Sequence, residues 1–457
     1  MAGSDFSVNG RRVVVVGAAR SGIAAAELLV RRGARVTLTE TRATFEQADR
    51  LRESGVALEL GGHQPSTLAG ADLVVASPGV ALEQPVFEAA RARGVEIIGE
   101  LELAWRWVKG PVIAVTGTKG KSTTTTLIGR MLREAGRDVL VGGNIGVPLS
   151  AQVDDSTPGT VHVVETSSFQ LETTTTFRPW ISLWLNFAAD HLDRHPSIEA
   201  YADAKARVFA NQTPDDWAVV NADDPVVMDK VAASRARREL FSPSGAIDRG
   251  FVAEGDWIVR RTAAGSDRLV PMSAIELTGR HMQHNVTAAV AVSTIAGADP
   301  AAMRSALKDF HGLPHVMEPV ATVRGVRFVN DSKATNVEAA RRSIESFDGP
   351  VVAIIGGLFK GGDLRELRDP LRAREGSVVA IGEAAPLVHA ALDGVVPVQD
   401  ARSMPEAVRT GYGLAGGRGV VVLAPACASF DWFRDYAERG LVFKDAVRTL
   451  EEELKTP

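Results

Sequence analysis

The feature that most constrains the fold of this chain is a repeated unit. It consists of a short run of Val, Ile and Leu, a loop containing glycine, and a segment with helical periodicity. Such runs occur at residues 12–16, 36–39, 73–76, 112–116, 161–164, 181–185, 326–329, 351–355, 378–381 and 420–423. Because the runs do not alternate apolar with polar residues, they are typical of strands buried on both faces. With helices between them, they predict parallel sheets of the α/β class.

The length and two breaks in this pattern predict three domains. The chain has 457 residues, more than one core of about 150 residues would hold. The breaks fall near Lys109-Gly110-Pro111 and Gly312-Leu313-Pro314, which gives domains at 1–108, 109–311 and 312–457. Between residues 239 and 271 the pattern turns irregular and polar. This stretch predicts either short antiparallel strands or an excursion within the middle domain.

Composition narrows the class of protein. A net charge of −5 creates no overall field that would recruit nucleic acid. The single cysteine, Cys427, excludes an intramolecular disulfide and a cysteine-built zinc site, fits a reducing compartment, and has no activating base beside it. An apolar run after Arg11-Arg12 could pass for a signal peptide, but Arg20-Ser21-Gly22 interrupts it, and a strand, turn and helix explain it better. No apolar stretch reaches the roughly 18 residues of a membrane span. We therefore expect a cytoplasmic, multi-domain enzyme without a membrane anchor.

The strand at 112–116 leads into the strongest chemical motif. It is followed by Gly117-Thr118-Lys119-Gly120-Lys121-Ser122-Thr123 and by a helix with Leu127, Ile128, Met131 and Leu132 on one face. Glycines let backbone N–H groups face phosphate oxygens, the lysine reaches the outer phosphates, and the serine can ligate Mg²⁺. The first glycine of the general motif is replaced by Val115. The alternative is a capped helix start without a ligand, and the preceding strand favours the phosphate loop.

The glycine turn at residues 17–22 is less specific. It lacks the middle glycine that lets a pyrophosphate approach the backbone in dinucleotide folds. Glu40 ends the next strand, where an acidic side chain meets a ribose in such folds. NAD is therefore disfavoured. Either a related nucleotide or a purely structural turn explains the residues.

A lysine lies on the apolar stripe of a predicted helix that begins near Ser197. The stripe consists of Tyr201, Ala204, Lys205, Val208 and Phe209. A buried ammonium is costly, so Lys205 either extends along the stripe to water or reacts with CO₂ to form a carbamate whose oxygens suit Mg²⁺. His191 and His195 lie four residues apart, but no third nitrogen or sulfur ligand is near enough in sequence to predict zinc.

Together these motifs resemble the Mur ligase family. The resemblance covers essentially the whole chain and adds further strings: Gly143–Gly146, Glu165–Leu171, Asp190–His195, His284-Asn285, Asn330–Asn336, Gly356-Gly357 with Lys360, and Pro425–Ser429. The strings of the third domain resemble the branch of the family that adds D-glutamate.

The resemblance implies an architecture and a reaction. The fold would be a Rossmann-like UDP-binding domain, a P-loop ATPase-like central domain with a mainly parallel sheet, and a Rossmann-like third domain. ATP would phosphorylate the L-alanyl carboxylate of UDP-MurNAc-L-Ala, and D-glutamate would attack the acyl phosphate. Such an enzyme makes peptidoglycan precursors for cell shape and division, and would act as a monomer.

The resemblance also implies roles for residues. ATP would be bound by Gly117, Thr118, Lys119, Gly120, Lys121, Ser122, Thr123, Asn285, Asp331 and Lys333. Two Mg²⁺ ions would be held by Ser122, Glu165, His191 and carbamylated Lys205, which with Lys121 form the catalytic set. The UDP substrate would be bound by Ser21, Glu40, Thr41, Arg42, Ser77, Pro78, Gly79, Asn144 and Ser167. D-Glutamate would be bound by Thr335, Lys360, Ser429 and Tyr436, a set apt for a dianion.

Three departures from the family pattern and two rival interpretations accompany this hypothesis. Lys119 replaces the usual asparagine, Met282 replaces a frequent asparagine, and Val316 stands where many relatives have arginine. These departures affect nucleotide affinity and leave the reaction class unchanged.

The two rival interpretations are a folylpolyglutamate synthase and a nucleotide-binding regulator that ligates nothing. A UDP-type first domain disfavours the former, and intact Glu165, His191 and Lys205 disfavour the latter.

Overall fold

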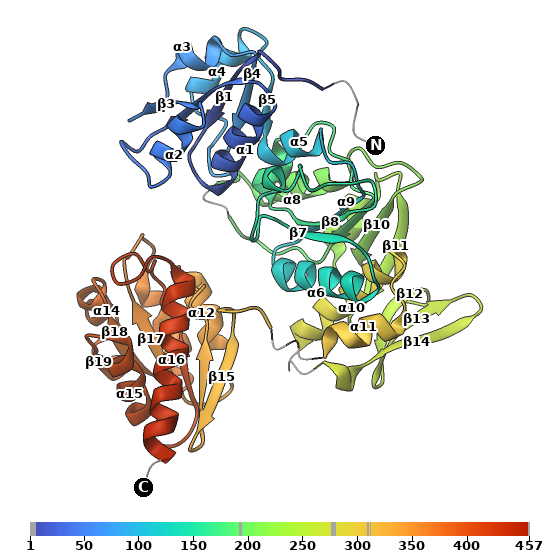
Figure 1. Ribbon diagram of the computed structural model, residues 1–457. Coiled ribbons are helices and arrows are strands. Elements are labelled where there is room, and N and C mark those ends of the chain that lie inside the picture. Colours follow the sequence, from blue (N-terminus) through green and yellow to red (C-terminus); the bar gives the residue numbers. More distant parts are fainter. Residues whose placement is uncertain (1–5, 192–193, 276–279, 309, 311, 456–457) are drawn as a thin grey trace. The chain divides into compact units, whose positions relative to one another are not determined.

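The computed structural model describes residues 6–191, 194–275, 280–308, 310 and 312–455. The chain divides into two compact units, residues 1–310 and 311–457. Within the described residues the strands form three sheets, of five, nine and six strands (Figure 1). The first unit holds the five- and nine-stranded sheets, and the second unit holds the six-stranded sheet.

The first sheet is parallel throughout, in the order β3-β2-β1-β4-β5. Its strands are β1 (Arg12–Val16), β2 (Arg35–Glu40), β3 (Ala57–Leu60), β4 (Leu73–Ala76) and β5 (Ile97–Gly99), and its helices are α1 (Arg20–Arg31), α2 (Ala48–Glu53), α3 (Pro65–Ala69), α4 (Val86–Arg91) and α5 (Glu100–Trp105). Strand order reverses between β1 and β4. Ligands of open parallel sheets bind beyond the carboxyl ends of the strands at such a point.

The central sheet has the order β14-β13-β12-β11-β10-β9-β6-β8-β7. Its strands are β6 (Val112–Thr116), β7 (Val139–Gly143), β8 (Val161–Glu165), β9 (Ile181–Trp184), β10 (Trp217–Asn221), β11 (Arg237–Ser242), β12 (Gly250–Glu254), β13 (Trp257–Thr262) and β14 (Gly265–Pro271). Its helices are α6 (Lys121–Glu134), α7 (Ser168–Glu172), α8 (Ile198–Ala206), α9 (Pro225–Val231), α10 (Arg280–Ile295) and α11 (Pro300–Leu307), with 3₁₀ turns η1 (Leu149–Ala151), η2 (Arg207–Phe209) and η3 (Met272–Ala274).

The irregular stretch predicted between residues 239 and 271 is part of this sheet. Strands β12, β13 and β14 pair antiparallel with one another, whereas β12 joins β11 in parallel. The prediction of short antiparallel strands is thus confirmed. They extend the sheet and do not leave it.

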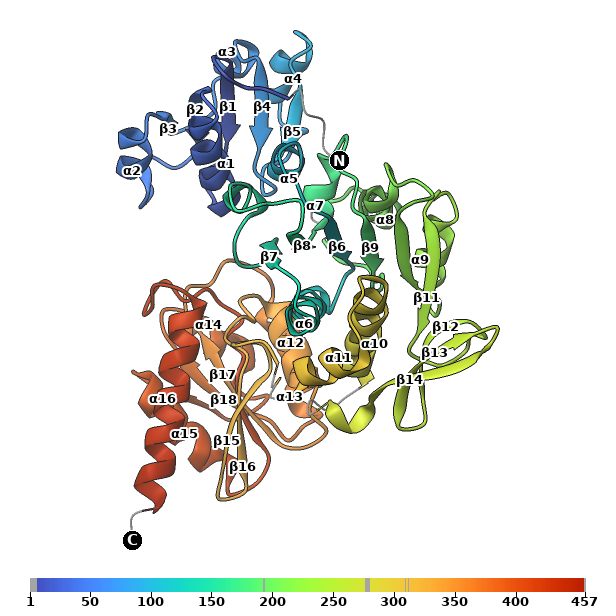
Figure 2. The same cartoon turned by 45° about the vertical axis from the view of Figure 1, so that its right-hand side comes forward.

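Strand β6 shows why its sequence is a continuous apolar run. Ile113 and Val115 belong to one core cluster, whereas Val112 and Ala114 belong to the cluster on the opposite face. Helices α6, α10 and α11 pack together over the first of these faces (Figures 1 and 2). Both faces of the strand are therefore buried, as the parallel-sheet pattern predicts.

The second unit is built in the same way, with the strand order β15-β16-β20-β17-β18-β19. Its strands are β15 (Glu318–Val323), β16 (Val326–Asn330), β17 (Val351–Gly356), β18 (Ser377–Ile381), β19 (Val398–Asp400) and β20 (Val420–Leu423), and its helices are α12 (Val337–Glu345), α13 (Arg368–Arg372), α14 (Ala385–Leu392), α15 (Met404–Ala415) and α16 (Tyr436–Lys455), with η4 (Leu364–Leu367). Among the described strands of this sheet, only the β15–β16 pair is antiparallel. The mainly parallel α/β class is confirmed in all three sheets.

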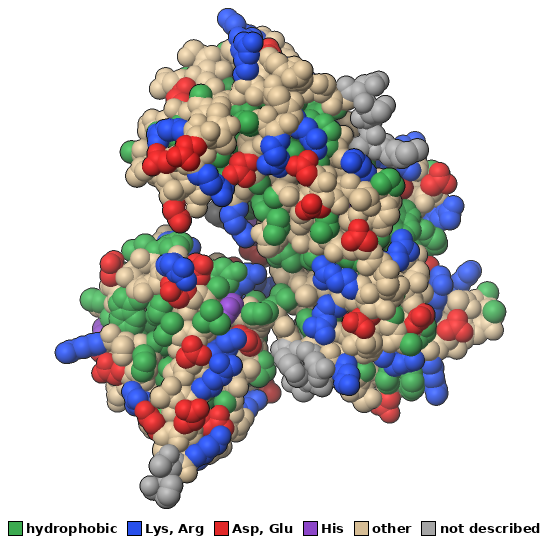
Figure 3. All heavy atoms as spheres, in the orientation of Figure 1, with side chains coloured by type: hydrophobic (Ala, Val, Ile, Leu, Met, Phe, Trp, Pro, Cys, Tyr) green, Lys and Arg blue, Asp and Glu red, His purple; other side chains and the backbone are tan. Residues whose placement is uncertain are grey.

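Two properties of the whole chain complete the fold. Among the described residues, no helix combines the length and apolar character needed to cross a bilayer. On the face shown in Figure 3, basic and acidic side chains are interspersed on each unit. Because the described part of this face has no large patch of one charge, we looked for binding sites at the carboxyl ends of the parallel strands.

Candidate active site

The phosphate loop connects β6 to α6. Gly120 immediately precedes the helix with a φ of 80°, and the helix start has no side-chain cap hydrogen bond. A Cβ at Gly120 would collide with the side chain of Asn285, which α10 presents to the loop. The helix start thus depends on glycine and on a neighbouring helix, which argues against the alternative of a simple capped helix.

Two lysines meet at one carbonyl of this loop. Lys121 Nζ donates to the carbonyl oxygens of Gly117 and Thr118, both at 3.0 Å, and Lys205 Nζ donates to that of Gly117 at 2.8 Å. Lys205 is 1% exposed, so the prediction that it extends to water is wrong. Burial, assisted by the charge of Lys121, lowers the pKa of Lys205 to about 6, against the opposing effect of nearby Asp190 and Glu165. The amine is therefore poised to be neutral.

Glu165, at the end of β8, is a buried carboxylate with an unused oxygen. It is 2% exposed, and its Oε1 accepts a hydrogen bond of 2.7 Å from Asn144 Nδ2. Its Oε2 is buried and finds no hydrogen-bond partner in the described part of the chain. Because an unsatisfied buried carboxylate oxygen is costly, this atom fits a role as a cation ligand.

His191 lies on the edge of the same region. Its backbone has a φ of 55°, a conformation that is rare for residues other than glycine and that recurs at functional sites. Its ring packs near those of Phe169 and Tyr201, at centroid distances of 5.1 and 6.0 Å. Leu192 and Asp193 of the same motif lie outside the described residues. His195, by contrast, is buried between Ser168 and Glu172 and has a structural role.

A metal site made only of His, Cys, Asp and Glu is absent from the described residues. Any cation at Glu165 would need further oxygen ligands from other groups. Ser122 in the first turn of α6 is one source, and a modified Lys205 would be another.

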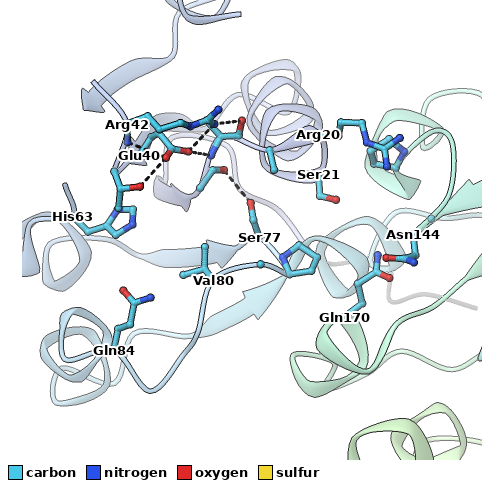
Figure 4. A pocket seen from close by; sticks show the side chains of 18 residues that line it. Arg20, Ser21, Glu40, Arg42, His63, Ser77, Val80, Gln84, Asn144 and Gln170 are labelled. Atoms are coloured by element: carbon cyan, nitrogen blue, oxygen red, sulfur yellow. Dashed lines mark hydrogen bonds and ion pairs between the residues drawn. The ribbon is translucent and has the colours of Figure 1, made fainter. Parts of the chain in front are cut away.

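A second site is a cavity of about 460 Å³ at the carboxyl ends of the first sheet (Figure 4). Among its lining residues are Ser21, Glu40, Thr41, Arg42, Ser77, Pro78, Gly79 and Asn144, which the sequence had grouped as one binding set. Asn144, which directly follows β7, and Gln170, on α7, line the cavity opposite the residues of the first sheet (Figure 4). Ser167 is not among the lining residues, because its side chain caps α7 in a reciprocal pair with Gln170.

Glu40 organises the turn that forms one wall of this cavity. It accepts hydrogen bonds from the Ala18 N–H at 2.7 Å and from the Arg42 guanidinium at 3.1 Å. Burial would raise its pKa, but these hydrogen bonds, with those from the Arg42 N–H and Thr41, lower it to about 2. The carboxylate is thus already engaged, which favours the structural-turn interpretation for Glu40 itself.

The second unit brings the predicted residues of the third domain to the carboxyl ends of adjacent strands. Asp331 and Lys333 follow β16, Lys360 follows β17 and Ser429 follows β20. Burial raises the pKa of Asp331 to about 6, although the Met317 N–H donates to it at 3.1 Å. Lys333 and Lys360 are exposed, whereas Ser429 is 2% exposed. Thr335 is half-buried, and Tyr436 is exposed.

The sequence did not predict Arg439, which joins two of these loops. It is 1% exposed and donates to the carbonyl oxygens of Ser332, Cys427 and Ala428 at 2.9, 3.2 and 3.2 Å. Burial lowers its pKa to about 10. The signal was present, because Arg439 stands one turn before Phe443 on the apolar stripe of α16, much as Lys205 does on α8.

The chain has three mainly parallel sheets with polar residues at their carboxyl ends, as in nucleotide-binding folds. One of them carries a phosphate loop beside the buried carboxylate of Glu165. These features are typical of a multi-domain, nucleotide-dependent ligase. Comparison with models of known protein families agrees. The family model "Mur ligase MurD-like, N-terminal domain" matches residues 11–99, the model "Mur ligase middle domain" matches residues 115–293, and the model "Mur ligase, glutamate ligase domain" matches residues 317–427.

Full-length relatives extend the match. The chain is 46% identical over 447 residues to UDP-N-acetylmuramoylalanine--D-glutamate ligase of Acidobacterium capsulatum, covering 97% of both chains. It is 42% identical over 453 residues to the protein of the same name from Koribacter versatilis, covering 98% of this chain and all of the relative. The chain belongs to the Mur ligase family, whose members are ATP-dependent enzymes that form amide bonds.

Solved structures share the fold. Crystal structures of the UDP-N-acetylmuramate-alanine ligase MurC from Thermotoga maritima and of MurF from Acinetobacter baumannii superpose with TM-scores of 0.55 and 0.56. The sequence identities are 18% and 15%. The matches cover 96% and 98% of this chain, and 100% and 93% of the two structures. At these identities the likeness concerns architecture alone.

Proposed function

We propose that this chain ligates D-glutamate to UDP-N-acetylmuramoyl-L-alanine with ATP, yielding ADP and phosphate. The observation that carries the proposal is the identity of 46% over 97% of the chain to a relative of that name, which extends through the amino-acid-binding third domain. The reaction belongs to cytoplasmic synthesis of peptidoglycan precursors. The protein acts as a monomer of three domains, with boundaries at 108/109 and 311/312.

The reaction has two chemical steps. The alanyl carboxylate attacks the γ-phosphorus of ATP, forming an acyl phosphate and releasing ADP. The neutral amine of D-glutamate then attacks the acyl carbon, the amide bond forms, and inorganic phosphate leaves while the nitrogen loses a proton. Both steps bring anions together, so charge neutralisation and positioning supply most of the catalysis.

The chain's own residues provide these effects around α6. Lys121 and the first-turn N–H groups of the helix bind the phosphates, since those N–H groups have no intrahelical acceptor. Ser122 and Glu165 fit one Mg²⁺, and Glu165, His191 and a carbamate on Lys205 fit a second. When bound, these ions would offset the negative charge on the phosphate and carboxylate oxygens. Asn285 and Asp331 would contact the adenine and ribose, with Lys333 nearby.

The carbamate on Lys205 is supported by the environment of its amine. The buried nitrogen attacks CO₂, a C–N bond forms and one proton is released. The product carries a negative charge beside Lys121, which neutralises it, and two oxygens that suit Mg²⁺. The uncharged amine needed for this step is favoured by the lowered pKa.

The remaining sites receive the two substrates. The cavity of the first unit receives the UDP end, with Arg42 and the helix start at Arg20 and Ser21 as its cationic and polar lining. Thr335, Lys360, Ser429 and Tyr436 receive D-glutamate, whose two carboxylates suit a lysine and hydroxyl groups.

The decisive experiment measures phosphate release with UDP-MurNAc-L-Ala, ATP and Mg²⁺ while the amino acid is varied. We expect release with D-glutamate and little with L-glutamate or other amino acids. Release with a folate and L-glutamate, and none with the UDP substrate, would instead establish the folylpolyglutamate synthase. No turnover with the complete set would favour the regulator.

A further inference from the structure

Asn186 directly follows the buried strand β9 and contacts the phosphate loop through its whole carboxamide. Its Oδ1 accepts hydrogen bonds from the Thr118 N–H at 3.1 Å and the Lys119 N–H at 2.9 Å. Its Nδ2 donates to the Lys119 carbonyl at 3.0 Å. One neutral side chain therefore holds consecutive peptide groups in the part of the loop that precedes the helix.

This half of the loop has little regular structure of its own. Gly117 has a φ of 149°, a conformation that L side chains rarely adopt, and the β9 end lies against it. Because Asn186 engages the Thr118 and Lys119 N–H groups, phosphate oxygens are left to the N–H groups of the first turn of α6. Asn186 thus sets which part of the loop receives the nucleotide.

The same segment leads to His191. The Thr118 hydroxyl donates to the Ala188 carbonyl at 3.2 Å and accepts from the Ala188 N–H at 3.0 Å. The Trp184 indole N–H donates to the Asn186 carbonyl at 3.1 Å, which fixes the backbone of this segment to the sheet. Loop 117–119 and segment 186–188 are consequently linked by hydrogen bonds on both sides.

We infer that Asn186 is a positioning residue for ATP: it fixes the first half of the phosphate loop and keeps that loop in register with the segment that carries His191. The inference rests on the proposed function for its substrate, ATP. It assigns Asn186 no contact with the reacting atoms.

Two substitutions separate the features of the carboxamide. Asn186→Ala removes the three side-chain hydrogen bonds, but keeps a fourth, from the Thr118 N–H to the Asn186 backbone carbonyl at 3.1 Å. Asn186→Asp keeps two acceptors for the loop N–H groups, loses the donor to Lys119, and places a negative charge near the phosphates. The matched control is Asn221→Ala. Asn221 ends the neighbouring strand β10, donates to the Leu185 carbonyl after β9 and accepts from the Asp223 N–H, both at 3.0 Å, so its side-chain hydrogen bonds lie outside the loop at 117–119.

The structural readout is hydrogen exchange of the Thr118 and Lys119 amides in the nucleotide-free protein. We expect Asn186→Ala to accelerate exchange of the Lys119 amide about tenfold, the equivalent of about one lost hydrogen bond, and that of the Thr118 amide less, because its bond to the Asn186 backbone carbonyl remains. Asn186→Asp should keep them protected, and Asn221→Ala should match the parent protein. Unchanged protection in Asn186→Ala would overturn the inference.

The functional readout is the KM for ATP against kcat. Misplaced phosphate contacts should raise KM about 10- to 100-fold in both Asn186 variants, with a smaller fall in kcat. The Asn186→Asp effect should also grow at low salt, since its charge repels the phosphates. A KM within about twofold of the parent in both variants would contradict the assignment. Equilibrium binding of ADP gives the same comparison without turnover, so failure of the proposed ligase reaction would not be confused with failure of this inference.

Discussion

Two turns in the first unit have the same construction and opposite electrostatics. After β1, a glycine turn leads into α1, which begins at Arg20, and after β6 a glycine turn leads into α6, which begins at Lys121. In the first turn the Ala18 N–H is held by the carboxylate of Glu40. In the second the Thr118 and Lys119 N–H groups are held by the neutral amide of Asn186.

The difference shows how one topology serves two kinds of ligand. In the first turn the carboxylate of Glu40, paired with Arg42, occupies the Ala18 N–H and so withholds it from a phosphate. In the second turn a neutral amide adds no negative charge, and Lys121 begins the helix whose first-turn N–H groups face the ligand. The side chain that satisfies the turn, more than the glycine pattern, decides how near a phosphate comes.

The largest effect on the difference between the two turns is expected from substitution of Lys121. Lys121→Ala should lower ATP turnover by roughly 10³-fold, because it removes the cation closest to the transferring phosphate. Phosphate release measures the loss, and circular dichroism should show an unchanged fold. Near-normal release would remove the phosphate-loop assignment.

The next largest effect is expected at Lys205. Lys205→Ala should reduce activity by roughly 100-fold through loss of a metal ligand, and short carboxylic acids should partly restore it by supplying the anionic oxygens. Lys230→Ala is the control, since Lys230, on the neighbouring helix α9, forms an ion pair with Asp203 of α8, the helix that carries Lys205. Absence of rescue across a wide concentration range would count against the carbamate.

The first turn can be tested through stability. Because the pKa of Glu40 is lowered to about 2 from 4.5, its charged form stabilises the fold above about pH 4.5, and this contribution disappears as the pH falls toward 2. Glu40→Gln should lower the unfolding free energy at pH 7 by about 2 kcal/mol after allowance for solvent screening. Denaturant titrations at several pH values should show the difference shrinking in acid. If the difference in unfolding free energy between the two proteins did not change with pH, the stabilisation would not depend on ionisation of Glu40.

The smallest effect is expected at Arg20, the counterpart of Lys121. Arg20 lines the cavity proposed for the UDP substrate, and its guanidinium donates to the Gly146 carbonyl at 2.9 Å. Arg20→Ala should raise the KM for the UDP substrate about tenfold by removing one charge-assisted contact, and leave the KM for ATP unchanged. Steady-state kinetics with each substrate varied in turn distinguishes the two. If Arg20→Ala changed only the KM for ATP, the turn before α1 would be assigned to ATP and not to the UDP substrate.

Sequence patterns predicted most of the strands that are buried on both sides. Every predicted apolar run is a strand, because a central parallel strand requires apolar residues at successive positions. The missed edge strands are β3, β5, β7, β15 and β19, of which β3 and β19 are only partly buried, so their residues are less constrained. Strand β10 was also missed, although it is buried inside the central sheet.

The family resemblance implied the roles of Glu165, Asp331 and Ser429, which the structure places at or after the carboxyl ends of strands. Lys205 was detectable from the sequence itself, as a charge on an apolar stripe. No role was predicted for Asn186. Its partners are backbone atoms of a loop some 70 residues away, and no spacing in the chain encodes such contacts.

The buried thiol of Cys427 has a practical consequence. It is fully inaccessible, the only sulfhydryl of the chain, and burial raises its pKa to about 12 despite nearby Arg439. An alkylating reagent can react with it only while the surrounding strands of the second unit are transiently apart. The labelling rate of the unmodified protein therefore reports how often that unit opens, and a ligand that holds its loops together will slow the labelling.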